Sequence, residues 1–141
     1  MTATEKKLAK LKKGLLSALR KESADFGLYV VPNAEMERLR RALRARRDFK
    51  GAEARKIAHE KEVNVLSFPE PKAFPHPETG KRWLGEVYLN RAFARLGADR
   101  LPFLMVHGVL HLLGYRHEKR RDIMKMEALE RKLCRALGIR P

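Results

Sequence analysis

Cysteine is almost absent from this chain of 141 residues, in which Cys134 is the only one. A single cysteine excludes a disulfide within the chain, so stability has to come from a buried core, and the chain is long enough to form one. We therefore expect a single domain over residues 1–141. A lone thiol also fits a reducing compartment, and we expect a cytoplasmic protein.

Long hydrophobic runs are missing as well. Residues 1–19 carry five lysines between short apolar steps and contain no continuous apolar stretch. A signal peptide needs an apolar core of about 7–15 residues, and a membrane helix needs about 20. The sequence therefore predicts neither a signal peptide nor a membrane span.

Acidic residues are scarce relative to basic ones. The chain has 32 Lys and Arg against 17 Asp and Glu, a formal net charge of +15. Such a field attracts polyanions, so nucleic acid is the first partner to consider, and anionic membranes or acidic proteins are the alternatives. The excess peaks at residues 38–47, which hold six arginines and no carboxylate, and again at residues 116–121.

A glutamate is missing from an otherwise complete metal-binding motif. His107, His111 and His117 lie in one short apolar window at spacings of four and then six residues. These are the ligand spacings of the zincin signature H-E-x-x-H-x-x-G-x-x-H, but Gly108 stands where that signature has its general base. The pattern keeps the metal ligands and loses the usual peptidase chemistry.

The spacing places the three imidazoles near one another. On a helix, His107 and His111 lie one turn apart, with about 5–6 Å between Cβ atoms. Gly114 is suited to end such a helix, and the reversed chain brings His117 back as a third ligand. Three protein ligands with one open position are typical of catalytic zinc. The alternative is a set of core histidines, but each buried imidazole would then need its own hydrogen-bond partners, so we favour the metal site.

Hydrophobic periodicity and turn residues predict the secondary structure. Helices are expected at residues 4–21, from Asn33 as N-cap to about Arg47, at 90–96 with Asn90 as cap, from Asp99 to Leu113, and at 119–137. Strands are expected at residues 26–31, 63–68 and 83–89, the state of 48–62 is left open, and 69–80 is expected to be a proline-rich loop. This order predicts an α/β or α+β domain with a small mixed sheet, about five helices and the histidine helix at its centre.

Three segments follow one another along the chain: N-V-L-S-F-P at residues 64–69, L-G-E-V at residues 84–87, and the histidine motif at residues 107–117 with Gly108, Gly114 and Tyr115. Together they resemble the YbeY family of bacterial metal-dependent endoribonucleases. The resemblance implies an endoribonuclease that prefers single strands, binds one zinc ion, and acts in maturation of small-subunit rRNA and in ribosome quality control. It also implies that His107, His111 and His117 are the zinc ligands, and Gly108 is the family's own residue at its position.

The chain departs from the family pattern at two positions. Arg116 stands where the family usually has aspartate, and Glu118 and Glu86 are the carboxylates that we consider as replacements. The family's arginine upstream of the V-L-S-F strand aligns with Ile57, so Arg55 and Lys56 are the nearby candidates. We take Arg55, Lys56 and Arg116 as the candidate RNA contacts.

The sequence predicts metal-assisted cleavage of an RNA phosphodiester, and no residue stands out as general base. One rival is a zincin-type peptidase, which would need a carboxylate from elsewhere in the chain. The other is a non-catalytic ribosome or RNA-binding protein stabilised by a structural zinc, which would have a fourth protein ligand.

Overall fold

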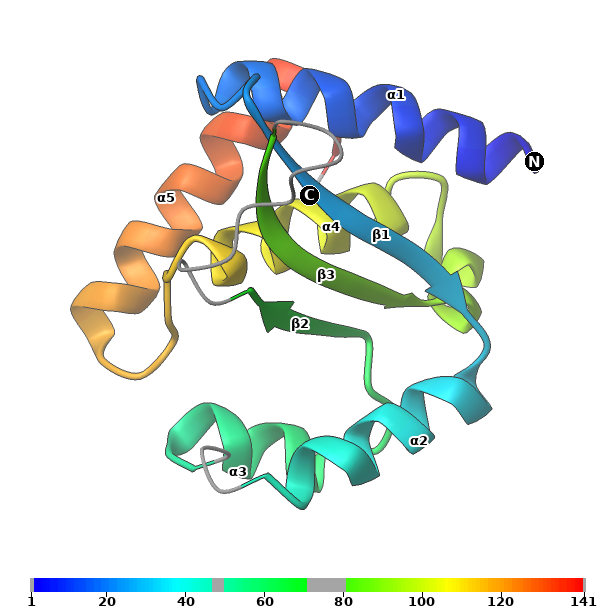
Figure 1. Ribbon diagram of the computed structural model, residues 1–141, viewed down its shortest axis with the longest axis vertical. Coiled ribbons are helices and arrows are strands. Elements are labelled where there is room, and N and C mark those ends of the chain that lie inside the picture. Colours follow the sequence, from blue (N-terminus) through cyan, green and yellow to red (C-terminus); the bar gives the residue numbers. More distant parts are fainter. Residues whose placement is uncertain (1, 47–49, 71–80, 141) are drawn as a thin grey trace.

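A three-stranded sheet with helices packed around it forms the computed structural model, which describes residues 2–46, 50–70 and 81–140 (Figure 1). The elements are, in order, α1 (Ala3–Ala18), β1 (Ala24–Val31), α2 (Asn33–Arg44), α3 (Ala52–His59), β2 (Val65–Pro69), β3 (Arg82–Asn90), the 3-10 helix η1 (Arg91–Leu96), α4 (Arg100–Leu112) and α5 (Arg120–Leu137). The expected α+β class is confirmed.

The sheet is mixed, as expected, and has the order β1-β3-β2. The central strand β3 pairs in parallel with β1 and antiparallel with β2. Successive side chains of a strand point to opposite faces. Val87 and Leu89 of β3 are therefore buried in a larger core on one face, whereas Tyr88 contacts a smaller core on the other. Strand β2 lies at the edge of the sheet, beside the histidine helix.

The larger core lies between the sheet and three helices, α1, α4 and α5, which pack against one another. Helix α4 contacts both β2 and β3, and Met105, Val106, Val109 and Leu110 on it have no exposed surface. Its central position explains why its sequence is apolar almost all around. The histidine helix is thus in the middle of the fold, as predicted.

The smaller core joins α2 and α3 to the sheet, beyond strand β2 (Figure 1). Its fully or almost fully buried members are Met36 of α2, Val63, and Leu66 of β2. Helix α3 forms in the polar segment whose state was left open, and it contributes Ile57 to this core. The α2–α3 pair therefore rests on a core of its own.

Several predicted boundaries are corrected by the structure. Helix α1 ends at Ala18 rather than at residue 21, because the backbone turns back at Arg20 with φ 56°. Asn33 is not an N-cap: Pro32 holds that position, and the Asn33 side chain instead accepts a hydrogen bond from Asn90 Nδ2 at 2.8 Å. Asn90 does cap η1.

The second helix is also shorter than predicted, because α2 ends at Arg44 with Ala45 as its C-cap rather than at about Arg47. The proline-rich loop expected over residues 69–80 lies outside the described residues from position 71 to 80. In the ranges that the structure describes, no helix is both long and apolar enough to cross a bilayer.

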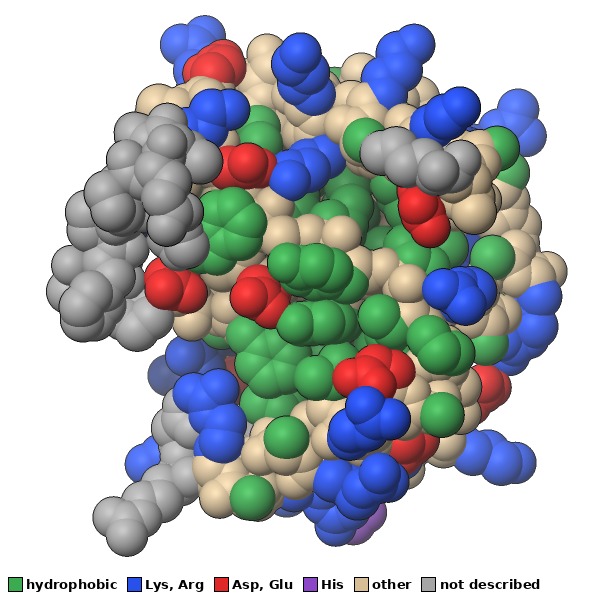
Figure 2. All heavy atoms as spheres, turned by 45° about the vertical axis from the view of Figure 1, so that its right-hand side comes forward, with side chains coloured by type: hydrophobic (Ala, Val, Ile, Leu, Met, Phe, Trp, Pro, Cys, Tyr) green, Lys and Arg blue, Asp and Glu red, His purple; other side chains and the backbone are tan. Residues whose placement is uncertain are grey.

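Part of the sheet face opposite α4 is open to solvent. Tyr29 of β1 is 43% exposed and stacks on Tyr88 with 5.0 Å between ring centroids, and Phe68 meets Tyr88 edge-on at 5.6 Å. The space-filling view shows hydrophobic side chains gathered at the centre of this side, with Lys and Arg around them (Figure 2). On the face in view, the basic side chains thus surround the apolar centre.

Candidate metal centre

Helix α4 and the turn that follows it bring the three histidines together. His107 and His111 lie one turn apart near the end of α4, and Gly114 then adopts φ 98°, a left-handed conformation that suits glycine. The Tyr115 N–H donates to the Leu110 carbonyl at 3.0 Å, so the chain folds back over the last turn of the helix. His117 returns to the other two, with ring centroids 4.7 Å from His107 and 4.9 Å from His111.

Hydrogen bonds at Nδ1 orient two of the three rings. The His107 Nδ1–H donates to the carboxylate of Glu130 on α5 at 2.5 Å, and Glu130 is only 6% exposed. The His111 Nδ1–H donates to the Tyr115 carbonyl at 2.9 Å. An imidazole that carries its proton on Nδ1 presents the lone pair of Nε2. In their neutral forms, both rings therefore present the lone pair of Nε2.

These two Nε2 atoms face each other across 3.1 Å. Two lone pairs at that distance repel unless a cation lies against both of them. Zinc–nitrogen bonds of about 2.0–2.1 Å at a tetrahedral angle separate ligand nitrogens by about 3.3–3.4 Å, which is close to the observed spacing. All three candidate ligand atoms lie within 4.8 Å of one another. The donor set and its spacing thus fit a zinc ion.

Among the described residues, the cluster consists of three histidines, without a cysteine or a carboxylate as a fourth member. Glu130 approaches His107 from the side away from the cluster and holds a ring nitrogen. This carboxylate–histidine arrangement is the usual outer support of a metal-binding histidine, because it fixes the tautomer and strengthens the ligand. A three-histidine set is typical of catalytic zinc, whereas structural zinc has four protein ligands.

Gly108 is required by the packing of α4 against the sheet. A Cβ atom at this position would lie 2.6 Å from Val87 Cγ1 and 3.1 Å from both Ser67 Oγ and Val65 Cγ2. The Ser67 hydroxyl donates to the Gly108 carbonyl at 2.8 Å, which fixes the contact between helix and strand. Position 108 therefore faces β2 and β3, and a glutamate has no room there.

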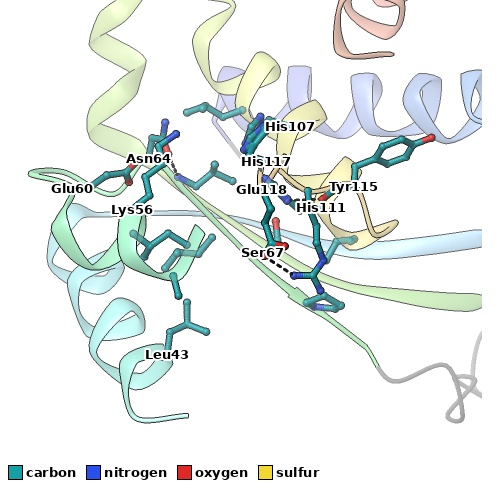
Figure 3. Close-up of a pocket in the computed structure, with 18 of the residues that line it drawn as sticks. Leu43, Lys56, Glu60, Asn64, Ser67, His107, His111, Tyr115, His117 and Glu118 are labelled. Carbon is teal, nitrogen blue, oxygen red and sulfur yellow. Dashed lines mark hydrogen bonds and ion pairs between the residues drawn. The ribbon is translucent and has the colours of Figure 1, made fainter. Parts of the chain in front are cut away.

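A cavity of about 530 Å³ opens beside the histidines (Figure 3). It lies between α4 and the following turn on one side and α2, α3 and the edge strand β2 on the other. In the close-up, Lys56, Glu60 and Asn64 are grouped at one end and the histidines at the other. Its size is in the range of small-molecule and substrate sites.

Two of the three predicted RNA contacts line this cavity, namely Lys56 of α3 and Arg116 after α4. The third, Arg55, is exposed and lies outside the lining. The structure also brings Arg46, Lys50 and Arg100 to the cavity. Arg46 belongs to the arginine-rich segment noted in the sequence, whereas no local pattern marks the other two. Five cations among the described lining residues make the cavity a site for an anion.

Two carboxylates line the same cavity, Glu60 and Glu118. Burial raises the pKa of the Glu60 carboxyl, although the charges of Lys56, Arg40 and His107 act in the opposite direction. Glu118 lies 3.7 Å from Arg116 as an ion pair.

Glu130 is the functional residue that sequence reasoning missed. It lies 23 residues after His107 and looks at first like one more acidic residue of the last helix. A signal was nevertheless present, because Met126, Glu130, Leu133 and Leu137 follow the apolar stripe of α5 at helical spacing. A carboxylate in an apolar stripe needs a partner in the core, and His107 is that partner.

Comparison with known proteins agrees with this geometry. A sequence model of the family described as Endoribonuclease YbeY matches residues 2–138. The chain belongs to the YbeY family. Curated relatives named Endoribonuclease YbeY include one from Nitrobacter hamburgensis, 40% identical over 57% of this chain and 47% of its own length. Another, from Rhodospirillum rubrum, is 43% identical over 66% of this chain and 48% of its own length.

A third relative of the same name, from Roseiflexus, is 34% identical over 82% of this chain and 71% of its own length. The chain therefore spans about half the length of several curated YbeY relatives that it matches, and more of others.

The two departures from the YbeY pattern both lie at the cavity. Arg116 and Ile57 are lining residues, so the chain places a cation and an apolar side chain where the family resemblance implied an aspartate and an arginine. Of the two carboxylates considered as replacements, Glu118 lines the cavity. Glu86 is held on β3, where its carboxylate accepts a hydrogen bond from the Tyr88 hydroxyl at 2.5 Å, and it does not line the cavity.

Proposed function

We propose that this chain is a zinc-dependent endoribonuclease that cleaves single-stranded RNA, with one zinc ion held by His107, His111 and His117. The observation that carries the proposal is the cluster of three histidines, with the Nε2 atoms of His107 and His111 3.1 Å apart, at the wall of a cavity lined with cations. Membership of the YbeY family supports the same reaction.

The residues around the cavity have distinct roles in this proposal. Bound zinc supplies Lewis acidity that polarises a phosphoryl oxygen. Lys56 and Arg116 hold the phosphate and stabilise the negative charge that develops on it. Glu130 keeps the His107 ring in its tautomer and orientation. Gly108 keeps α4 against the sheet, so that the histidines stay at the cavity wall.

We further propose that the RNA is ribosomal, that the chain acts in the maturation of small-subunit rRNA and in ribosome quality control, and that it works in the cytoplasm. The net charge of +15 supports binding to a structured polyanion such as the ribosome. Cys134 is the chain's single cysteine and is buried, so the chain does not depend on a disulfide of its own, which fits a reducing compartment. Accumulation of unprocessed small-subunit rRNA in cells that carry only a His111→Ala chain would support this role.

The two rival functions have less support. A peptidase needs a general base beside the metal, and the packing around Gly108 leaves no space for the glutamate of that class. Its base would have to be Glu60 or Glu118, the two carboxylates of a lining that also holds five cations and so favours an anionic substrate. A structural zinc site needs a fourth protein ligand, and the described residues supply three.

The test combines metal analysis with RNA cleavage by the purified full-length chain. We expect one zinc per chain and cleavage of a labelled single-stranded RNA, and we expect His111→Ala to lose both. His59→Ala is the matched control, because His59 is exposed on α3 and does not line the cavity. Cleavage that persists at the same rate in His111→Ala would contradict the proposal, and zinc binding without any cleavage would favour the non-catalytic alternative.

A further inference from the structure

The cavity beside the histidines has a second wall that the metal centre does not use. This wall is apolar and is formed by Leu43 of α2, Ile57 of α3 and Leu66 of β2. In the close-up, Leu43 and the apolar side chains near it lie on the α2–α3 side, away from the three histidines (Figure 3). The cavity thus offers a charged region and an apolar region next to each other.

The apolar wall is held in place by contacts of its own. Leu43 and Ile57 pack against the smaller core. Arg40 of α2 donates from NH1 to the carbonyls of Ile57 at 3.1 Å and Glu60 at 2.5 Å, and it pairs with Glu37 at 2.5 Å. Its side chain is only 13% exposed. Arg40 therefore satisfies the last carbonyls of α3 and fixes that helix against α2 before any ligand arrives.

Polar groups lie at the end of this wall. Glu60 and Asn64 line the cavity and are drawn side by side with Lys56 in the close-up (Figure 3). The Asn64 Oδ1 accepts from the Val65 N–H at 2.8 Å, which fixes the orientation of its amide. A carboxylate offers acceptors and an amide NH2 offers donors, so the two can meet the donor and acceptor groups along the edge of one nucleobase.

We propose that this region is a nucleobase subsite: one unpaired base of the RNA lies against the partly exposed Leu43 and Ile57, with Glu60 and Asn64 at its edge. The inference rests on the proposed function and deepens it. The five cations of the lining select a polyanion, and an apolar wall within reach of them suits the flat face of a base rather than another phosphate. A base in a duplex is stacked and has its edge paired, so it cannot enter. The subsite therefore gives a physical reason for selecting single strands.

The test measures binding by the zinc-loaded chain at low temperature, with gel analysis to establish that the strands stay intact during the measurement. One probe is a short oligoadenosine, and the other is a ribose-phosphate strand of the same length and charge without bases. We expect wild type to bind the oligoadenosine about five- to tenfold more tightly, the lower part of the range for contact with a base. Both affinities should fall with salt.

Variants assign the effect to the proposed residues. Ile57→Ala should bring the ratio of the two affinities close to one, whereas Lys56→Ala should weaken both strands and keep the ratio. Leu39→Ala is the matched control, because Leu39 packs on the same core without lining the cavity, and it should keep the ratio. Melting curves establish that each variant is folded, and Leu43→Ala replaces Ile57→Ala if that variant unfolds.

The possible outcomes distinguish a failure of the nucleobase subsite from a failure of the proposed endoribonuclease function. Equal affinity of wild type for both strands, or an unchanged ratio in folded Ile57→Ala or Leu43→Ala, would overturn the nucleobase subsite and leave the endoribonuclease proposal standing. No binding of either strand would contradict the proposed function itself.

Discussion

The buried carboxylate of Glu130 allows a direct test of how the metal centre is held. In Glu130→Gln, the amide oxygen can still accept the hydrogen bond from His107 Nδ1–H, but the negative charge is gone. A hydrogen bond to a charged group contributes about 1.5–3 kcal/mol, against about 1 kcal/mol for a neutral one. The difference of about 1 kcal/mol corresponds to a five- to tenfold loss of zinc affinity.

Glu130→Ala should have a larger effect, because it leaves the His107 Nδ1–H without its acceptor. Glu130 is only 6% exposed, so water does not readily take the place of the lost carboxylate. The ring is then free to change tautomer and orientation. Loss of such an outer partner lowers metal affinity by about 10–100-fold, and we expect the upper end of that range, about 2.7 kcal/mol.

Zinc affinity is measured by competition with a chromogenic chelator, together with thermal melting of the metal-free chains. Glu127→Gln is the control, because Glu127 is exposed on the same helix, one turn earlier. The reasoning is refuted if both Glu130 variants are folded and bind zinc as tightly as Glu127→Gln.

Three further predictions concern packing, protonation and RNA contact. Gly108→Ala should lower the free energy of unfolding by about 1–3 kcal/mol in urea titrations, because the new Cβ would meet Val87 Cγ1 at 2.6 Å; an unchanged midpoint would contradict this packing. Burial raises the pKa of Glu60, so the folded state binds a proton there more tightly than the unfolded state; this stabilisation should be fully present below the unfolded pKa of about 4.3 and be lost as pH rises from there through the higher folded pKa. Glu60→Gln should remove that fall, and parallel stability curves for the two chains would count against it. Arg116→Ala should weaken RNA binding and reduce the slope of log K against log salt by about one, whereas Arg55→Ala, outside the cavity, should have a smaller effect; the reverse order would contradict the assignment.

Local sequence signals were sufficient for most elements and for the three histidines. Helix α4 and its stop at Gly114 follow from spacing and from the conformational freedom of glycine, both of which are local properties. Strand pairing was less accessible, because β-forming residues in 26–31 and 83–89 do not specify that those strands lie side by side and parallel. Helix α3 was left open because its short polar segment has few apolar residues, and its helical state depends on contacts such as that of Ile57 with the smaller core.

The support of the site was harder to predict than its ligands. Glu130 reaches His107 only after α5 packs on α4, and Arg46, Lys50 and Arg100 meet at the cavity from two separate parts of the chain. Contacts between distant segments depend on tertiary structure, and the sequence of any one segment gives little indication of them. The carboxylate within the apolar stripe of α5 is the exception, since its position already requires a buried partner.

The two separate cores support different sides of the cavity. The histidines stand on the larger core, whereas the opposite side of the cavity stands on the smaller core under α2 and α3. Sequence drift in the α2–α3 hairpin can thus reshape which RNA segments are accepted while the ion-holding frame stays intact. Under the proposed function, substitutions in α2 and α3 are therefore the ones that would change the choice of RNA without removing the ion-binding histidines.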